Sequence, residues 1–435
     1  MNKKVAIRRE DKNIWERRVP VVPAHVAQLQ REHGLVFCVQ PSEIRAFPDA
    51  AYREAGAEIR EDLSDCPVML AVKEIPLDCF QPHGTYVFFA HVIKGQKYNM
   101  AMLQRLLDQG CTLIDYERIT DENNRRLIFF GRHAGMAGMI DSLCALGQRL
   151  EWEGIPTPFS QIQPAYTYGD SDSAKEAIRA VGEQIAAEGL PPELTPFVCG
   201  FAGYGNVGLG AIEIYDQLPV IEITPEELLS LDADDVGAHQ LVKVVFKEVH
   251  TVKPRDPEQP FDLHGFFAHP EAYESQFEQY LPHLSMLINA IYWSPVSPRL
   301  VTKDALRRLY AGEQQPRLRV IGDVSCDIEG GIEATVRATE PDDPVYVYEP
   351  LTGAAPAGVA GHGPVIMAVD NLPCELPAES STDFSTALLP YIRPIVTADT
   401  TVPLDACALP PEIKRAVIVY RGELTPDYRY LEQYL

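Results

Sequence analysis

Residues 197–208 read FVCGFAGYGNVG, an apolar run that passes directly into a glycine-rich turn. The apolar residues predict a buried strand, and the spacing over 209–218 predicts a helix after the turn. In a dinucleotide-binding βαβ unit, the first glycine permits the turn, the second admits a pyrophosphate close to the backbone, and the third lets helix and strand pack tightly. The stretch therefore predicts a nucleotide-binding loop, with a plain tight turn as the alternative. Its cofactor-binding residues would be Gly203, Tyr204, Gly205, Asn206, Val207 and Gly208.

A long stretch of α/β character precedes this loop. Strands are expected over 4–8, 35–40, 68–72, 86–91 and 112–116, with helices over 24–33, 50–57 and 99–109. This alternation is typical of parallel strands covered by helices, with functional side chains at the carboxyl ends of the strands. A chain of 435 residues is also long enough for two domains, each with a full core.

The remaining segments predict how the two domains divide the chain. A long helix over 134–153 is expected to cross from one domain to the other, and a helix over 381–389 to return. Further strands are expected near Phe197, Val220, Val244, Leu287 and Arg319 and over 345–348. We therefore expect a catalytic domain of residues 1–133 plus 375–435 and a dinucleotide-binding domain of residues 134–374.

Composition excludes several classes of protein. A net charge of −24 repels nucleic acid and anionic membranes, and no apolar stretch approaches the roughly 20 residues that span a bilayer. The first residues lack the apolar region of a secretory signal. Nine cysteines, an odd number without a CxxC pair, argue against a disulfide framework or a zinc site. We expect a cytoplasmic protein with reduced thiols, whose oligomeric state the sequence does not indicate.

Two predicted strand ends carry ionisable groups, Lys73 and His91. A lysine at the end of an apolar strand is commonly a surface residue with a buried stem, and a histidine there is commonly structural. At successive strand ends facing a cleft, however, the two could act as an acid–base pair, if burial and neighbouring charge move their pKa values toward neutrality.

Several further segments carry a family resemblance. They are RREDK at 8–12, RRVP at 17–20, QPSEIR at 40–45, VKEIP at 72–76, HVIKGQ at 91–96, LIDYER at 113–118, AGMAGMID at 134–141, DVSCD at 323–327, DNLP at 370–373 and RGELTPDY at 421–428. In this order the chain resembles the alanine dehydrogenase/transhydrogenase superfamily. Within it, the chain is similar to the lysine-forming saccharopine dehydrogenases and to the lysine–2-oxoglutarate reductase half of bifunctional aminoadipic semialdehyde synthase. The half that oxidises saccharopine is expected to be absent.

The resemblance implies an α/β fold of two Rossmann-like doubly wound domains with an active-site cleft between them. It implies an oxidoreductase that joins L-lysine and 2-oxoglutarate through an imine, which a reduced nicotinamide converts to saccharopine. Lys73 and His91 would be the acid–base groups, with Glu74 and Glu117 as the acidic neighbours that tune them. Asp327 would lie near the nicotinamide.

The resemblance also implies binding residues. Arg18 matches a clamp for a substrate carboxylate, which its planar guanidinium suits. Arg125 or Arg126 would supply a second contact, although a solvated strand edge is the alternative for this pair. In the cofactor site, Asp323 belongs to a matching segment, and Val324 and Leu372 would form pocket walls.

Cofactor choice depends on the residue about 20 positions after the glycines, where an acid would bind the ribose 2′-hydroxyl of NAD. Thr224 stands at that position, flanked by Glu222 and Glu226, and no arginine is present for a 2′-phosphate. The missing acid removes a repulsion toward NADP. We therefore expect NADPH, with NADH as the alternative.

Two other functions stay open at this point. One is a related amino-acid or opine dehydrogenase with another amine donor, and the other is a catalytically inactive, nucleotide-binding regulatory domain. For the enzyme we expect the cleft to close around its ligands, with hinges near 132–135 and 372–377.

Overall fold

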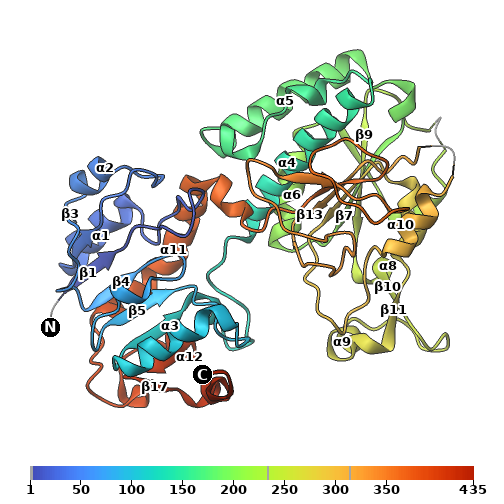
Figure 1. Ribbon diagram of the computed structural model, residues 1–435. Helices are drawn as coiled ribbons and strands as arrows, with labels where there is room; N and C mark the ends of the chain where they lie inside the picture. The colour runs from blue at the N-terminus through green and yellow to red at the C-terminus, as the bar shows by residue number, and fades with distance from the viewer. Residues whose placement is uncertain (1–2, 233–234, 313–314) are drawn as a thin grey trace. The chain divides into compact units, whose positions relative to one another are not determined.

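The computed structural model describes residues 3–232, 235–312 and 315–435, and the chain forms two compact units. Unit 1 comprises Met1–Phe130 and Pro377–Leu435, and unit 2 comprises Gly131–Leu376 (Figure 1). The sequence placed the two boundaries after residues 133 and 374, and the structure places them after Phe130 and Leu376. The expected cleft between the units, its closure and its hinges stay predictions.

Unit 1 is built on one mixed sheet, in the order β17-β16-β6-β5-β4-β1-β2-β3. The strands β1 to β6 pair in parallel. At one edge of the sheet, β16 pairs antiparallel with β6, and β17 pairs antiparallel with β16. The strands are β1 (Lys4–Ile7), β2 (Val36–Val39), β3 (Glu58–Ile59), β4 (Val68–Leu70), β5 (Thr85–Phe88), β6 (Thr112–Asp115), β16 (Val417–Tyr420) and β17 (Glu423–Leu424). The helices are α1 (Pro23–His33), α2 (Asp49–Glu54), α3 (Lys97–Asp108), α11 (Pro377–Val396) and α12 (Pro411–Ala416).

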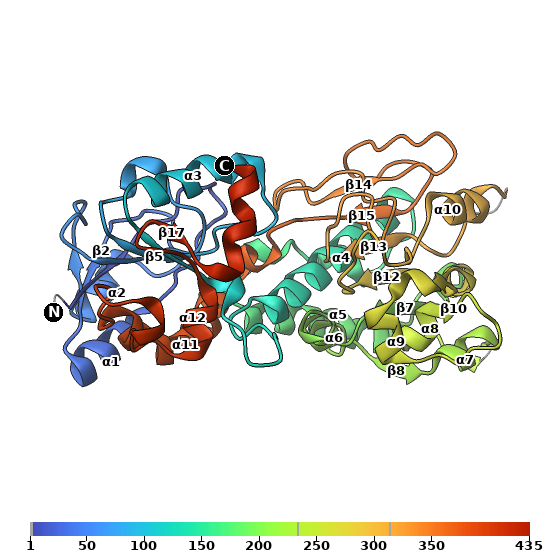
Figure 2. The same ribbon diagram turned by 90° about the horizontal axis from the view of Figure 1, so that it is seen from below.

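Helices cover both faces of this sheet. Figure 2 shows α3 on one face and α1, α2, α11 and α12 on the other. Alternate residues of a strand face opposite ways, so that Val5 and Ile7 of β1 join the core under α1 and α11, while Ala6 joins the core under α3. Because both faces are buried, the strands are apolar almost throughout, which explains why the sequence predicted them.

Unit 2 contains a seven-stranded sheet in the order β14-β15-β13-β12-β7-β9-β8, which is parallel except for β14. Its strands are β7 (Phe197–Ala202), β8 (Val220–Ile223), β9 (Leu241–Phe246), β12 (Met286–Asn289), β13 (Val320–Asp323), β14 (Val345–Val347) and β15 (Val365–Met367), with a separate pair of β10 (Val252–Pro254) and β11 (Tyr273–Ser275). The helices are α4 (Gly131–Trp152), α5 (Ser171–Glu188), α6 (Asn206–Tyr215), α7 (Pro225–Leu229), α8 (Glu248–Thr251), α9 (Leu263–Ala268) and α10 (Lys303–Tyr310).

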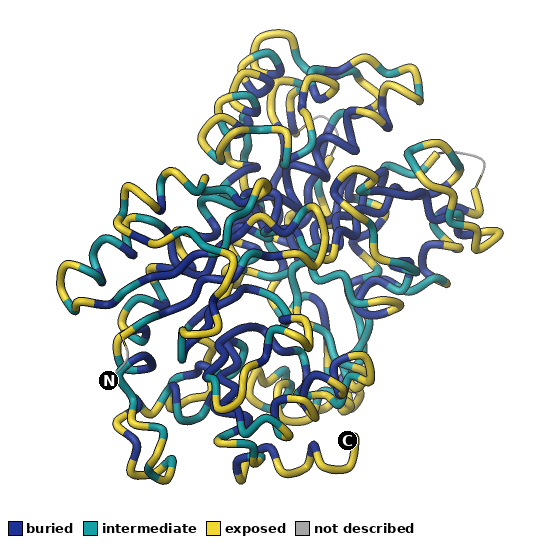
Figure 3. Tube along the Cα trace, turned by 60° about the vertical axis from the view of Figure 1, so that its left-hand side comes forward, coloured by how far each residue is buried: buried dark blue, intermediate teal, exposed yellow. Residues whose placement is uncertain are grey.

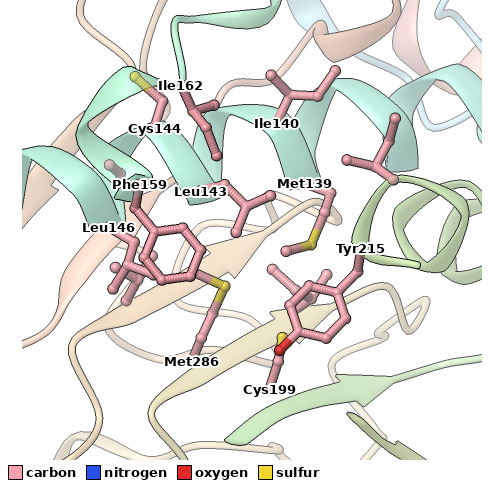
Figure 4. Close-up of a cluster of buried hydrophobic side chains, with 14 of the residues drawn as sticks. Met139, Ile140, Leu143, Cys144, Leu146, Phe159, Ile162, Cys199, Tyr215 and Met286 are labelled. Atoms are coloured by element: carbon pink, nitrogen blue, oxygen red, sulfur yellow. The ribbon is translucent and has the colours of Figure 1, made fainter. Parts of the chain in front are cut away.

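This second sheet is also covered on both faces, with α4, α5 and α6 to one side and α10 to the other (Figure 1). Figure 4 shows the core beneath α4, where Met139 and Leu143 pack toward Phe159, Cys199 and Met286. In Figure 3 most strand residues are buried, and the exposed residues lie in the loops and on the outer faces of helices. Within the described ranges, no helix is both long enough and apolar enough to cross a bilayer.

The long helix α4 approaches α6 so closely that backbones touch. A Cβ on Gly135 would lie 1.8 Å from the carbonyl oxygen of Val207, and a Cβ on Gly210 would lie 2.0 Å from that of Arg132. Glycine at both positions is therefore a packing requirement. Because Val207 belongs to the glycine-rich loop and first turn of α6, this contact fixes the loop from behind.

Replacing Gly135 with alanine tests this requirement. Alanine favours a helix over glycine, yet the added Cβ would meet a backbone oxygen that cannot move aside. We expect Gly135→Ala to lower the free energy of unfolding by about 1–3 kcal/mol or more, measured by urea denaturation. The control is Gly169→Ala, because a Cβ at Gly169 meets nothing within 4 Å. Equal midpoints for the two variants would contradict the close packing.

Candidate active site

Charged residues gather at the carboxyl ends of neighbouring parallel strands in unit 1. Lys73 lies three residues after β4, His91 three residues after β5, and Glu117 two residues after β6. Glu10 follows β1, which pairs with β4. The strands predicted over 68–72 and 86–91 end earlier in the structure, at Leu70 and Phe88. Lys73 and His91 therefore lie on the loops that follow them. Such strand ends are where α/β sheets place functional side chains.

Glu74 is the centre of a hydrogen-bonded cluster. Nδ1 of His91 donates to its Oε1 at 2.7 Å, and Nζ of Lys12 lies 3.0 Å from its Oε2. Nδ2 of Asn99 donates both to Glu74, at 3.3 Å, and to the carbonyl of Ala90, at 2.9 Å. Burial alone would raise the pKa of Glu74, but the hydrogen bond and charge of His91 hold it below its usual value. The carboxylate thus fixes the imidazole orientation, and Lys12 and Asn99 are contributors that the sequence did not single out.

His91 also occupies an unusual backbone conformation. Its φ of 48° lies in the left-handed region, which a residue with a Cβ rarely adopts. The conformation persists because Glu74 holds the ring and Asn99 holds the preceding carbonyl. Strain of this kind concentrates where surrounding structure fixes a functional group.

Lys73 is mostly buried, and its backbone is anchored. The backbone N–H groups of Val72 and Lys73 donate to the two carboxyl oxygens of Glu10, at 2.7 and 3.0 Å. Burial lowers the pKa of the Lys73 ammonium, and the neighbouring charge of Arg18 lowers it further. A lysine shifted toward neutrality is suited to proton transfer, unlike an exposed surface lysine.

Arg18 is paired rather than exposed. Its Nε and Nη2 donate to the two oxygens of Glu16, at 2.8 and 2.6 Å, and both side chains are at most 2% exposed. The guanidinium also lies over the ring of Phe130, with 4.2 Å from Cζ to the ring centroid. Glu16 therefore fixes the orientation of Arg18 beside Lys73, and the role of Arg18 as a carboxylate clamp stays a prediction.

Two buried acids that the sequence missed hold the loops in place. Glu10 anchors the Lys73 loop, and Asp115 accepts from the N–H of Ala90 at 3.2 Å and from that of Glu117 at 2.8 Å. Burial raises the pKa of Glu10 to about 8 and that of Asp115 to about 7. The signal that could have found them is an acid at the end of an otherwise apolar strand.

Arg125 and Arg126 separate in the structure. Nε of Arg125 pairs with Asp121 at 2.7 Å, and the Arg125 side chain is 76% exposed. The guanidinium of Arg126 instead lies over the ring of Phe89, at 5.5 Å. Because Phe89 precedes His91 by two residues, Arg126 is the member of the pair that stands close to the cluster, and Arg125 matches the alternative of a solvated edge.

The glycine-rich loop of unit 2 has the geometry that its sequence predicted. Gly203 has a φ of 105°, and a Cβ on Gly208 would lie 2.1 Å from the carbonyl oxygen of Gly203. A Cβ on Gly205 would meet nothing within 4 Å, so the loop is open there, at the N-terminus of α6. The residues therefore fit a dinucleotide, whose pyrophosphate would lie against Gly205 and the free N–H groups of the helix.

The expectation that Thr224 ends the strand beside this loop is wrong. Thr224 follows β8, but β9 lies between β8 and β7, so Thr224 ends a strand that does not neighbour the glycine loop. The Thr224 hydroxyl accepts from the N–H of Glu227 at 3.2 Å and caps α7. Beside the loop stands Glu248, just after β9, whose carboxylate accepts from the hydroxyl of Tyr204 at 2.8 Å. Counting residues from the glycines cannot reveal an inserted strand.

Tyr204 lies between two cavities at this end of the sheet. One, of about 450 Å³, is lined by Glu248, Asn289, Ile291 and Trp293 among others. The other, of about 690 Å³, includes Thr224 and is lined by three basic residues and three acids, Lys243, Lys247, His250, Glu222, Glu226 and Glu227. The loop can thus be approached from a largely apolar side and from a side that carries charges of both signs.

The remaining predicted cofactor residues end or follow β13, or precede α11. Asp323 is buried and accepts from Asn289 Nδ2 at 2.8 Å and from the Thr335 hydroxyl at 2.5 Å, and burial raises its pKa to about 6. These bonds give Asp323 a structural role. Val324 and Leu372 pack on Gly138 of α4, where a Cβ would lie 2.7 and 3.1 Å from their side chains. Asp327 is partly buried in the turn that follows.

The raised pKa of Glu10 predicts a pH-dependent stability. Between about pH 5 and 8 the folded protein keeps a proton on Glu10 that the unfolded chain releases, so the free energy of unfolding falls as the pH rises. Glu10→Gln cannot ionise, and we expect its stability relative to the parent protein to improve over this range in urea denaturation. The exposed Glu122→Gln is the control, whose difference from the parent should stay constant. A constant difference for Glu10→Gln as well would contradict the shift.

Comparisons with known proteins cover both units. The chain is 37% identical to alpha-aminoadipic semialdehyde synthase of Arabidopsis thaliana over 98% of its length, and 35% identical to the mitochondrial enzyme of that name from Bos taurus over 99%. It spans less than half the length of these two relatives, 41% and 47%. It is also 26% identical to saccharopine dehydrogenase [NAD(+), L-lysine-forming] of Yarrowia lipolytica, over 91% of this chain and 93% of that one.

Solved structures share the fold. An L-alanine dehydrogenase matches with a TM-score of 0.62 at 18% identity, over 99% of this chain and 98% of that one. A transhydrogenase from Sinorhizobium meliloti matches with a TM-score of 0.59 at 15% identity, over 97% and 100%. Residues 6–137 match the family described as alanine dehydrogenase/PNT, N-terminal domain, and residues 173–427 match its C-terminal domain. The chain therefore belongs to the alanine dehydrogenase/PNT family.

Proposed function

We propose that this chain is an oxidoreductase that condenses L-lysine with 2-oxoglutarate and reduces the product to saccharopine, or catalyses the reverse reaction. The observation that carries the proposal is the placement of Lys73 and the His91–Glu74 pair after the neighbouring strands β4 and β5. The named activities of the semialdehyde synthases and of the fungal saccharopine dehydrogenase support the choice of substrates.

The reaction needs two kinds of proton transfer. The ε-amine of lysine must lose a proton before it attacks the keto carbon, and the carbonyl oxygen must gain protons before it leaves as water. We assign these transfers to Nζ of Lys73 and Nε2 of His91. Burial lowers the pKa of Lys73, which makes its proton easier to release. Glu74 engages Nδ1 of His91 and so leaves Nε2 as the nitrogen that faces substrate.

The substrates carry carboxylates, which need cationic partners. The charge of Arg18 acts on Lys73, and Arg126 lies over the ring of Phe89, two residues before His91. Arg18 would bind a substrate carboxylate while Glu16 holds its Nε and Nη2, so the pair is oriented before substrate arrives. Preorganised donors of this kind lose little entropy on binding.

The glycine-rich loop would hold the nicotinamide cofactor, with the pyrophosphate at Gly205 and the N-terminus of α6. When bound, the reduced nicotinamide supplies the hydride that converts the imine carbon to an amine. We further propose NADPH as this cofactor, with NADH as the alternative. Lys247, an exposed cation directly after β9, supports NADPH, although the cavity that it lines also holds Glu222, Glu226 and Glu227. The adjacent acid Glu248 opposes it.

Replacing Lys73 with methionine tests the catalytic assignment. Methionine keeps most of the volume of lysine but can neither donate nor accept the proton. We expect turnover of lysine, 2-oxoglutarate and NADPH to fall by at least about 100-fold, while NADPH binding measured by calorimetry stays unchanged. Lys94→Met, at an exposed lysine, is the control. Undiminished turnover in Lys73→Met would rule out the role of this residue and favour an alternative site.

Adjacent substitutions after β9 test the cofactor preference. We expect Lys247→Ala to raise the KM for NADPH about tenfold, the value of one charge-assisted hydrogen bond, and to leave the KM for NADH unchanged. Glu248→Gln should raise the KM for NADH, because its carboxylate is suited to a ribose hydroxyl. An unchanged KM for NADPH in Lys247→Ala would exclude Lys247 from the 2′-phosphate site.

A further inference from the structure

Two cysteines of unit 1 meet at one guanidinium, away from the candidate active site. Nη2 of Arg60 lies 2.9 Å from Sγ of Cys38 and 3.4 Å from Sγ of Cys66. Cys38 belongs to β2, Arg60 directly follows β3, and Cys66 lies just before β4. Residues from three places in the sequence therefore bring two sulfur atoms onto the same nitrogen.

The surroundings favour one thiolate in this pair. Arg60 also pairs with the carboxylate of Asp65, which holds the guanidinium against the sulfurs. Hydrogen bonds from Cys66 and from Arg60 lower the pKa of the Cys38 thiol to about 7, although burial opposes this. The same hydrogen bond, together with burial, raises the pKa of the Cys66 thiol. The two sulfurs thus share one proton, which Cys66 holds.

The two sulfurs differ in access. Cys38 is fully buried, whereas Cys66 is partly exposed, and Sγ of Cys66 also lies 3.6 Å from the carboxylate of Asp65. A small reagent from solvent therefore passes Cys66 to reach the Cys38 thiolate behind it. A stabilised thiolate with a second thiol beside it is the arrangement that converts a first oxidation into a disulfide.

We propose that Cys38 and Cys66 form a redox-active dithiol that small hydroperoxides oxidise to a reversible disulfide. The Cys38 thiolate takes one oxygen from the peroxide, the remaining hydroxide or alkoxide takes up a proton from solvent and leaves as water or an alcohol, and Cys38 becomes a sulfenic acid. The sulfur of Cys66 then attacks the Cys38 sulfur, the S–S bond forms, and the departing hydroxide takes the Cys66 proton and leaves as water. The two cysteines lose two electrons and the one proton that they share, and the peroxide gains these together with a second proton from solvent. A small dithiol or thiol reductant reverses the step by thiol–disulfide exchange.

This chemistry is separable from the proposed enzyme activity. Cys66 precedes β4 and Lys73 follows it, so the pair lies at the opposite end of that strand from the predicted acid–base group. The readout is a covalent bond, which is detected whether or not the chain turns over lysine.

The test uses the purified full chain, treated with hydrogen peroxide and then alkylated to trap free thiols. We expect a species lighter by two hydrogen atoms, and tryptic peptides 32–45 and 61–73 joined through Cys38 and Cys66, with reduction by dithiothreitol restoring both. Cys66→Ser should abolish the cross-link. Cys79→Ser is the matched control, because Cys79 is another partly exposed cysteine of unit 1, near Asp78 at 3.8 Å, and it should cross-link as the parent does.

Arg60 provides the second, quantitative test. Arg60→Met removes the cation, and we expect it to slow formation of the cross-link by about tenfold at neutral pH, because less of the Cys38 thiol is ionised. In this variant the second peptide begins at residue 54, since cleavage at position 60 is lost. Absence of a 38–66 cross-link in the parent protein, or a rate in Arg60→Met equal to that of the parent, would overturn the proposal.

Discussion

The structure of unit 1 depends on burying charge at the carboxyl end of its sheet. Glu10, Glu16 and Arg18 are all less than 9% exposed, and isolated charges in such places would be severely unfavourable. The fold pairs Glu16 with Arg18, whereas Glu10, whose pKa burial raises to about 8, keeps its proton at neutral pH and accepts hydrogen bonds from two backbone N–H groups. These same bonds place the Lys73 loop. The bonds that stabilise these buried side chains therefore also position Lys73 and Arg18 in the candidate site.

In unit 2 the main constraint is instead the close contact between the backbones of two helices. Its long helix α4 lies against α6 through glycines, and of the three loop glycines only Gly205 has open space where a Cβ would lie. Side-chain volume is removed where helices must touch and where a phosphate must approach. A mutation behind the loop, at Gly135, thus acts on the same backbone that faces the ligand. In this unit, helix packing and the opening for a ligand thus both depend on glycines that let the backbone be approached closely.

Features that depend on residues close together in the sequence were predicted. Features that depend on contacts between distant segments were not. The strand, turn and helix around residues 197–215 were predictable, because each glycine has a local reason. The position of β9 between β7 and β8 was not, since strand order depends on contacts across the sheet, and Glu248 was missed with it. Glu10 was missed because its amide partners are 62 and 63 residues away, and Asp115 because one of its two amide partners, that of Ala90, is 25 residues away. The strand-end pattern singled out Lys73 and His91 and the resemblance implied their roles, but neither gave an account of what orients them.

The most direct test of the proposed function follows the product rather than the cofactor alone. Isotopically labelled L-lysine, 2-oxoglutarate and NADPH are incubated with the full chain, and the products are identified by mass spectrometry. We predict labelled saccharopine in an amount equal to the NADPH oxidised. NADPH oxidation without labelled saccharopine, or a labelled product only with another amine donor, would contradict the account.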